Sequence, residues 1–298
     1  MSNRISHHGV IVGTDGSPWS QVAVKWAARE AMMRHVRLTV VHVVAPLPVV
    51  ASALAWTAGR VPEEVLEIQE NDGRRIIADA ITLVKDSVGS DRPEIDSEML
   101  FGRYVPALAD LSKEAQLMVV GCRGRTGQHR LLGPVSTGLI HHAHCPVAVI
   151  HDEEASSPQA TRLPVVVGID GSRASELATE IAFDEASRRG VDLVALHVWS
   201  DADISNAYGI DSGVVQSAAE NTLAKSLAGW QERYPEVAVQ RVVEFEGPVR
   251  HLLEQAEKAQ LVIVGSHRRG GVAAMVLGSV STAVVQEARV PVIVARQP

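Results

Sequence analysis

The sequence predicts two tandem α/β domains, each with a parallel sheet that carries helices on both faces. The first reason is an internal repeat, since V-G-T-D-G-S at residues 12–17 returns as V-G-I-D-G-S at residues 167–172. The second is a pair of apolar runs that contain a histidine, residues 38–43 and 193–198, with the same displacement of 155 residues. The third is the alternation of short apolar runs with helical segments, which is typical of an open parallel sheet. A repeat of this length corresponds to a whole domain. The repeating units of solenoid proteins are several times shorter.

The first half begins with a strand at the apolar residues 9–13. Ser17 then predicts an N-cap and Pro18 a first helical turn, for a helix that runs to about residue 35. The apolar run 38–44 predicts the second strand. The uncharged stretch continues beyond it, but the equivalent run in the second half stops at Asp201, so we do not expect a membrane span.

The remaining elements follow from hydrophobic spacing and from proline. A long amphipathic helix is expected from about residue 62 to 88, and residues 95–100 alternate as a half-exposed edge strand does. Pro106 predicts the start of a third helix that runs to about Ala115. The series ends with a strand, a helix and a strand at residues 117–121, 135–144 and 147–151.

The second half repeats this series and ends with a strand at residues 292–295. Residues 152–162 are rich in Ser, Glu and Pro and show no periodicity, so they predict a linker. We therefore expect domains at residues 1–153 and 163–298.

Composition excludes several classes of protein. The chain has 298 residues, 46% of them hydrophobic, so each half can bury a core of its own. A net charge of −7 argues against a nucleic-acid backbone as the main partner. The two cysteines, Cys122 and Cys145, give no disulfide framework, and the first eight residues contain no apolar signal segment. We expect a cytoplasmic protein.

The candidate site lies where strands end. Asp15 and Asp170 directly follow the first strand of each half, and a glycine-rich loop follows the fourth strand. In doubly wound sheets, ligands bind beyond the carboxyl ends of the strands, at the point where the strand order reverses.

The glycine-rich loops have the chemistry of a phosphate site. They span residues 121–133 and 265–278, and each leads into the first turn of a helix. Glycines let backbone amides approach a ligand, the helix N-terminus carries partial positive charge, and the arginines add donors. Neither loop is a P-loop or a dinucleotide G-x-G-x-x-G motif, so hydride transfer has no support.

Together these motifs resemble tandem universal stress proteins of the two-domain type common in actinobacteria, and the likeness covers both halves. The ATP-binding branch of that family carries G-x-x-G, nine residues and then G-[S/T] after the fourth strand, with an aspartate after the first. The resemblance implies a five-stranded parallel sheet of order 3-2-1-4-5 in each half, and an adenine nucleotide, ATP with Mg²⁺, in each half.

The resemblance also implies which residues contact the nucleotide. The aspartates would meet the adenosine, the valines after each strand-two histidine the adenine edge, and the loops the ribose and phosphates. In the first half these residues are Gly13, Asp15, Val43, Gly121, Cys122, Arg123, Gly124, Arg125, Gly127, Gly133, Val135 and Ser136. In the second half they are Gly168, Asp170, Val198, Asp201, Gly265, Ser266, His267, Arg268, Arg269, Gly270, Gly271, Gly278, Ser279, Val280 and Ser281.

Neither half matches the family pattern fully. Only eight residues separate Gly124 from Gly133, and Pro134 stands where the family has a hydroxyl residue. In the second half the spacing is intact, but Arg268 occupies the second glycine position. We expect the second half to hold the better site.

Several residues have simpler interpretations. Asp15 could only cap the turn after the first strand, which is a common use of aspartate. His42 and His197 are expected to be buried and hydrogen-bonded rather than catalytic. The cluster at residues 141–145 is not expected to bind a metal, because its counterpart lacks histidine and cysteine. Cys122 lies near arginines, so redox sensitivity is a hypothesis that rests on its position.

The expected function is that of an ATP-binding regulatory protein that signals through conformation or an unknown protein partner. No set of base, nucleophile and metal carboxylates accompanies the loop. The apolar terminal strands at residues 145–151 and 290–295 are expected to pair, between domains or in a homodimer. The alternatives are a slow ATP hydrolase and a nucleotide-free interaction module. Against the hydrolase, residues 13–17 depart from the motif S-G-G-x-D-S of the ATP pyrophosphatases.

Overall fold

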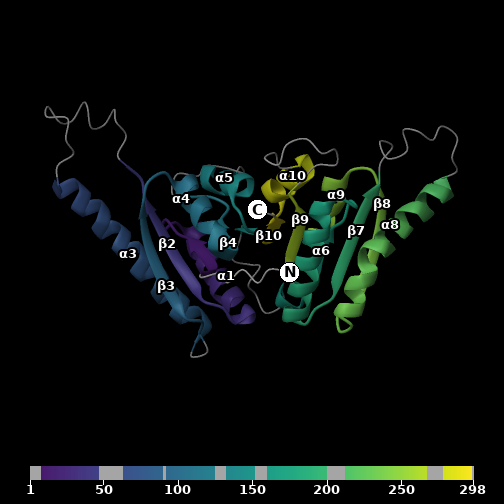
Figure 1. Ribbon diagram of the computed structural model, residues 1–298, viewed down its shortest axis with the longest axis horizontal. Coiled ribbons are helices and arrows are strands. Elements are labelled where there is room, and N and C mark those ends of the chain that lie inside the picture. The colour runs from purple at the N-terminus through teal and green to yellow at the C-terminus, as the bar shows by residue number, and fades with distance from the viewer. Residues whose placement is uncertain are drawn as a thin grey trace. The chain divides into compact units, whose positions relative to one another are not determined.

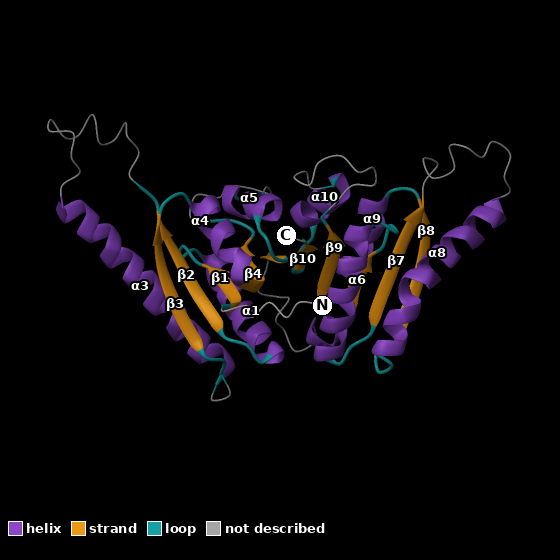
Figure 2. Ribbon diagram, in the orientation of Figure 1, coloured by secondary structure: helices purple, strands orange, loops and turns teal. Residues whose placement is uncertain are grey.

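The structure, a computed structural model, describes residues 8–46, 63–89, 92–124, 132–151, 160–199, 212–266 and 278–296 (Figure 1). Strands and helices alternate along both halves, as the sequence predicts (Figure 2). Eight of the predicted site residues lie outside the described residues, namely Arg125, Gly127, Asp201, His267, Arg268, Arg269, Gly270 and Gly271. Every helix in the described part of the chain is too short or too polar to span a bilayer.

The described part of the first half contains nine principal elements. They are β1 (Gly9–Gly13), α1 (Pro18–Arg34), β2 (Leu38–Val44), α3 (Glu63–Val88), β3 (Ile95–Phe101), α4 (Tyr104–Leu111), β4 (Ala115–Gly121), α5 (Pro134–His142) and β5 (Val147–Ile150). The third helix was expected to start at Pro106 but starts two residues earlier. Pro106 still lies in its first turn, where the missing N–H group has no intrahelical partner to lose.

The second half repeats these elements. They are β6 (Val165–Gly168), α6 (Arg173–Arg189), β7 (Leu193–Trp199), α8 (Ser212–Arg233), β8 (Val239–Phe245), α9 (Pro248–Ala256), β9 (Leu261–Gly265), α10 (Ser279–Glu287) and β10 (Val292–Ala295). The N-cap expected at Ser17 is confirmed, and Ser172 has the same role in the repeat. Ser17 Oγ accepts from the N–H of Ser20, and Ser172 Oγ accepts from the N–H of Ser175.

The chain forms two compact units. The first ends with α5, and the second begins at Cys145, so that β5 belongs to the second unit. The reason is that β5 pairs with β10 in antiparallel register, with Val292 opposite Val149 and Val294 opposite Val147. Of the linker predicted at residues 152–162, residues 152–159 lie outside the described residues, and Ala160–Arg162 form a short 3-10 helix. The strand β5, which precedes this segment, lies with the second unit.

The predicted order of five strands is found in the second unit, whereas the first unit has the first four strands of that order, because β5 belongs to the second unit. The first unit has the order β3-β2-β1-β4, and the second has β8-β7-β6-β9-β10, in both cases with parallel pairs. In the first unit Val12 lies opposite both Val40 of β2 and Val119 of β4. The ends of β1 and β4 are therefore neighbours, and the same holds for β6 and β9. This arrangement brings the two loops that carry the motifs to one edge of each sheet.

Helices cover both faces of each sheet, as predicted. In the first unit α1 contacts α3, and α4 contacts α5. In the second unit α6 contacts α8, and α9 contacts α10. The central strands are buried almost throughout, whereas β3 and β8, which lie at the ends of the strand order, consist of half-buried and exposed residues. The edge position predicted for residues 95–100 is confirmed.

Candidate functional site

The turn after the first strand holds its aspartate in the same way in both units. Asp15 Oδ1 accepts a hydrogen bond from the N–H of Ser17 at 3.0 Å, and Asp170 Oδ1 accepts from the N–H of Ser172 at 2.9 Å. The capping role considered for Asp15 is therefore real, and it uses one oxygen of each carboxylate. It also fixes the direction of each carboxylate at the edge of the sheet.

A histidine on the second strand supports each of these turns. His42 Nδ1 lies 2.8 Å from the carbonyl oxygen of Thr14, and His197 Nδ1 lies 2.7 Å from that of Ile169. A carbonyl only accepts, so each histidine carries its proton on Nδ1. The predicted hydrogen bonds are confirmed, but of the two histidines only His197 is buried, while His42 is half-buried. Each one holds the residue immediately before an aspartate.

The helix after the glycine-rich loop is attached to the end of the fourth strand. Ser136 Oγ donates to the carbonyl of Gly121 at 2.7 Å, and Ser281 Oγ donates to that of Gly265 at 2.6 Å. Both serines are buried, with 2% and 6% of their surface exposed. The family resemblance suggested a phosphate contact for these hydroxyls, whereas in the structure both hydroxyls donate to backbone carbonyl groups.

Gly121 and Gly265 are needed for close packing at the same place. A Cβ atom at Gly121 would lie 2.7 Å from the carbonyl oxygen of Trp19. At Gly265 it would lie 2.8 Å from the carbonyl carbon of Ala174. These glycines let the first turns of α1 and α6 approach the ends of β4 and β9.

The two helices that start at each site differ in how their N-termini are capped. The N-termini of α1 and α6 are capped by serine side chains, but the N-caps of α5 and α10 are Gly133 and Gly278, which offer none. Uncapped amides in a first turn attract anions, because they lack hydrogen-bond partners and lie at the positive end of the helix dipole. In α5 the first residue is Pro134, which has no N–H to offer.

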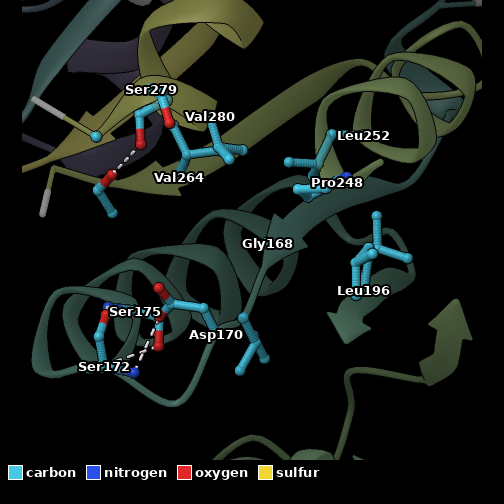
Figure 3. A pocket seen from close by; sticks show the side chains of 15 residues that line it. Gly168, Asp170, Ser172, Ser175, Leu196, Pro248, Leu252, Val264, Ser279 and Val280 are labelled. Atoms are coloured by element: carbon cyan, nitrogen blue, oxygen red, sulfur yellow. Dashed lines mark hydrogen bonds between the residues drawn. The ribbon is translucent and has the colours of Figure 1, made fainter. Parts of the chain in front are cut away.

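These features surround a cavity of about 300 Å³ in the second unit (Figure 3). It is lined by Gly168, Ile169, Asp170, Ser172, Ser175, Leu196, Val198, Pro248, Leu252, Val264, Gly265, Gly278, Ser279, Val280 and Ser281. Eight of these were candidates from the sequence, namely Gly168, Asp170, Val198, Gly265, Gly278, Ser279, Val280 and Ser281. The candidate Ser266 is buried next to them but is not part of the lining.

Sequence reasoning missed seven lining residues. Ser172 and Ser175 belong to the capped first turn of α6, and this cap could have pointed to them. Leu196 lies two residues before Val198 in β7, hence on the same face of the sheet. Pro248 and Leu252 come from α9, about 80 residues from Asp170, and no local signal marks them. The other two are Ile169 and Val264.

The cavity wall is apolar on one side and polar on the other. Figure 3 shows Leu196, Pro248 and Leu252 together, with Asp170 on another side and Ser279 across from it. Among the described lining residues, Asp170 is the single charged group. The cavity therefore offers an apolar surface, one carboxylate and one uncapped helix N-terminus.

The first unit has the same parts with different side chains. A Cβ atom at Gly124 would lie 2.8 Å from Asp15 Oδ2, so this carboxylate faces the start of the loop. The guanidinium of Arg123 lies over the Trp19 ring, 5.0 Å from its centroid. Arg123 Nε is buried and has no hydrogen-bond partner within the described residues.

The remaining first-half candidates lie around these groups. Gly13 faces Leu108 and Val120, Val43 is buried, and Val135 is half-buried. The N–H of Gly133 donates to the carbonyl of Cys122 at 2.8 Å. The Cys122 side chain is only 4% exposed, so an oxidant would need a local opening to reach its thiol.

Both repeats match the sequence profile of the universal stress protein family, over residues 7–151 and 162–296. The chain belongs to this family. Its relatives include universal stress protein Rv2623 of Mycobacterium tuberculosis, 54% identical over 100% of this chain and 99% of the relative. Universal stress protein Rv2005c of the same organism is 51% identical over the full length of both chains.

Solved structures of universal stress proteins share the fold. One from Archaeoglobus fulgidus superposes with a TM-score of 0.67, at 18% identity, and covers 97% of this chain and 96% of that one. This likeness shows the two-domain α/β architecture and no more.

The terminal strands of this universal stress protein pair with each other. The pairing expected between residues 145–151 and 290–295 is found within one chain, as the β5–β10 ladder. Because β9 occupies the other side of β10, this strand has no open edge. A homodimer stays a prediction, and it would need a different surface.

Proposed function

We propose that this universal stress protein binds one adenine nucleotide, ATP with Mg²⁺, in each half, and that the bound nucleotide sets a conformation that a protein partner or a second copy recognises. The observation that carries the proposal is the cavity between Asp170 and the uncapped N-terminus of α10. Such a cavity suits a ligand with an anionic end, a hydroxyl-bearing centre and an apolar end.

The orientation of the nucleotide follows from the two helix N-termini. The first turn of α6 is capped by Ser172, and the carboxylate of Asp170 lies beside it. A phosphate there would be repelled, whereas ribose hydroxyls could donate to the carboxylate. The first turn of α10 has no side-chain cap, so the phosphates belong at Gly278 to Ser281.

The adenine base fits the apolar side of the cavity. Leu196, Pro248 and Leu252 present an apolar surface, and Val198 lies at the end of β7. The volume of about 300 Å³ is at the lower end of the usual range for small-molecule sites. The loop at residues 267–277 lies outside the described residues, and the family pattern assigns it to the phosphates.

Regulation fits the described lining better than turnover does. Asp170, the one charged group in it, already accepts from the backbone of Ser172, and the Ser281 hydroxyl donates to Gly265. Neither is arranged as a base beside a nucleophile. Mg²⁺ would be held mainly by phosphate oxygens and water, since the described residues contain no cluster of three metal-ligating side chains.

We also propose that the protein is located in the cytoplasm and that it self-associates. Both cysteines are free and buried, which suits a reducing compartment.

The first experiment is to denature the purified protein and identify released nucleotide by ion-exchange chromatography. Co-purified ATP supports the proposal, ADP produced over many turnovers supports the slow hydrolase, and no binding in micromolar titrations supports the nucleotide-free module.

Calorimetry of Asp170→Asn then tests the site, because asparagine keeps the acceptor for Ser172 and removes the charge. We expect about tenfold weaker ATP binding in the second half. Asp15→Asn is the matched variant for the first half.

A further inference from the structure

His151 lies between two carbonyl groups. It directly follows β5, is 9% exposed, and packs against the C-terminal end of α10. Its Nδ1 lies 3.1 Å from the carbonyl oxygen of Val290, and its Nε2 lies 2.7 Å from that of Val285. Both partners only accept. A neutral imidazole has one N–H and can donate to one of them, whereas the imidazolium donates to both.

Helix α10 connects this histidine to the candidate nucleotide site. The carbonyl of Val285 is one of the last four of the helix, which have no partner within it. A positive charge at this end is favourable, because the helix dipole is negative there. The first turn of the same nine-residue helix lines the cavity with Ser279, Val280 and Ser281. A cation at one end and a phosphate at the other would stabilise the same helix.

The repeat places a permanent cation at the equivalent position. Counted from the terminal strands, His151 corresponds to Arg296, 145 residues later. Burial lowers the pKa of Arg296 from its usual value, and the nearby Cys145 thiol opposes that change. An arginine nevertheless stays protonated in proteins. The fold therefore accommodates a positive charge at this place after β10, and the first half has a titratable residue there instead.

The charged groups on the neighbouring elements are few. Strand β5 carries none, α10 carries Glu287, the following turn carries Arg289, and Arg296 follows β10. Glu287 and Arg289 are both exposed, so their opposite fields are screened by water. Asp152, Glu153 and Glu154 follow His151 in the sequence, outside the described residues.

We propose that His151 makes the second nucleotide site sensitive to pH. Protonation of His151 holds the C-terminal end of α10 through two carbonyls, and the ordered helix then binds phosphate more tightly at its N-terminus. This inference rests on the proposed nucleotide function. By linkage, bound nucleotide also favours protonation of His151.

The test uses calorimetric titration with ATP at pH 5.5 and pH 7.5, in full-length protein whose first site is weakened by Asp15→Asn. Three forms are compared: His151, His151→Arg, which is always charged, and His151→Gln, which is always neutral. ATP itself titrates in this pH range, and this affects its binding to all three proteins equally. The measured quantity is therefore the ratio of ATP affinities between two proteins at the same pH. We expect the histidine form to match His151→Arg at pH 5.5 and to bind about fivefold more weakly than it at pH 7.5. A ratio that stays constant between the two pH values would overturn the proposal.

A second measurement separates this proposal from the nucleotide function. Hydrogen exchange of α10 without nucleotide, compared between His151 and His151→Arg, should show equal protection at pH 5.5 and lower protection of the histidine form at pH 7.5. Absence of ATP binding at both pH values would refute the nucleotide function, and the exchange result would still test whether protonated His151 holds the C-terminal end of α10. If the ratio of protection between the two proteins is the same at both pH values, this role of His151 is refuted. If His151→Arg does not fold, the same comparisons are made against His151→Gln, which should match the histidine form at pH 7.5 only.

Discussion

Ser281 and Gly265 are joined by a 2.6 Å hydrogen bond from hydroxyl to carbonyl, which attaches the first turn of α10 to the end of β9. The repeat contains the same bond between Ser136 and Gly121, so it is a property of the domain rather than of one site. The positions of the uncapped amides depend on this attachment.

Ser281→Ala should destabilise the protein by about 1–3 kcal/mol, because the buried carbonyl of Gly265 would lose its partner. Urea unfolding followed by circular dichroism measures the loss. Ser279→Ala is the control, since Ser279 is exposed and should change stability by less than about 0.5 kcal/mol. Equal stability of the two variants would show that the bond does not hold α10.

Gly265→Ala should destabilise the protein by about 1–3 kcal/mol, because the new Cβ would lie 2.8 Å from the backbone of Ala174. Gly229→Ala is the matched control. A Cβ atom at Gly229 meets nothing within 4 Å, and in the helix α8 alanine should stabilise by about 0.5–1 kcal/mol. Opposite signs for these two substitutions in thermal or urea unfolding are the expected result, and a loss in both would contradict it.

Pro134 and Ser279 occupy the same place at the start of α5 and α10. Pro134→Ser supplies an amide N–H and a hydroxyl, so we expect the first half to gain about fivefold or more in affinity for ATP. Ser279→Pro should weaken the second half by a similar factor. Calorimetry with two independent sites measures both, and the idea fails if neither exchange shifts its own site.

Glu185 is fully buried and pairs with Arg189 at 2.8 Å. Glu185→Ala should cost about 3–5 kcal/mol, because it removes the buried carboxylate that neutralises the largely buried Arg189 guanidinium, which keeps a neutral partner in Gln260. Glu70→Ala removes an exposed pair with Arg74 at 3.2 Å and should cost less than about 1 kcal/mol. Denaturant midpoints compare the two variants, and similar losses would argue that Glu185 is not a buried partner in solution.

The sequence by itself determined the features that depend on neighbouring residues and on periodicity. Ser17 and Ser172 act as N-caps, Asp15 and Asp170 close the turns after the first strands, and residues 95–100 form an edge strand, all as local patterns predict. Propensity, capping and alternation act over a few residues, so a single chain displays them directly. The repeat strengthened each prediction because every pattern occurred twice.

Tertiary structure decided the features that join distant segments. Pro248 and Leu252 line the cavity of Asp170 only because α9 covers the end of β6, and Ser281 binds Gly265 across a loop. Likewise, β5 pairs with β10, and this places His151 between the carbonyls of Val285 and Val290. Such contacts depend on how helices and strands pack together, and no spacing within the sequence encodes that packing.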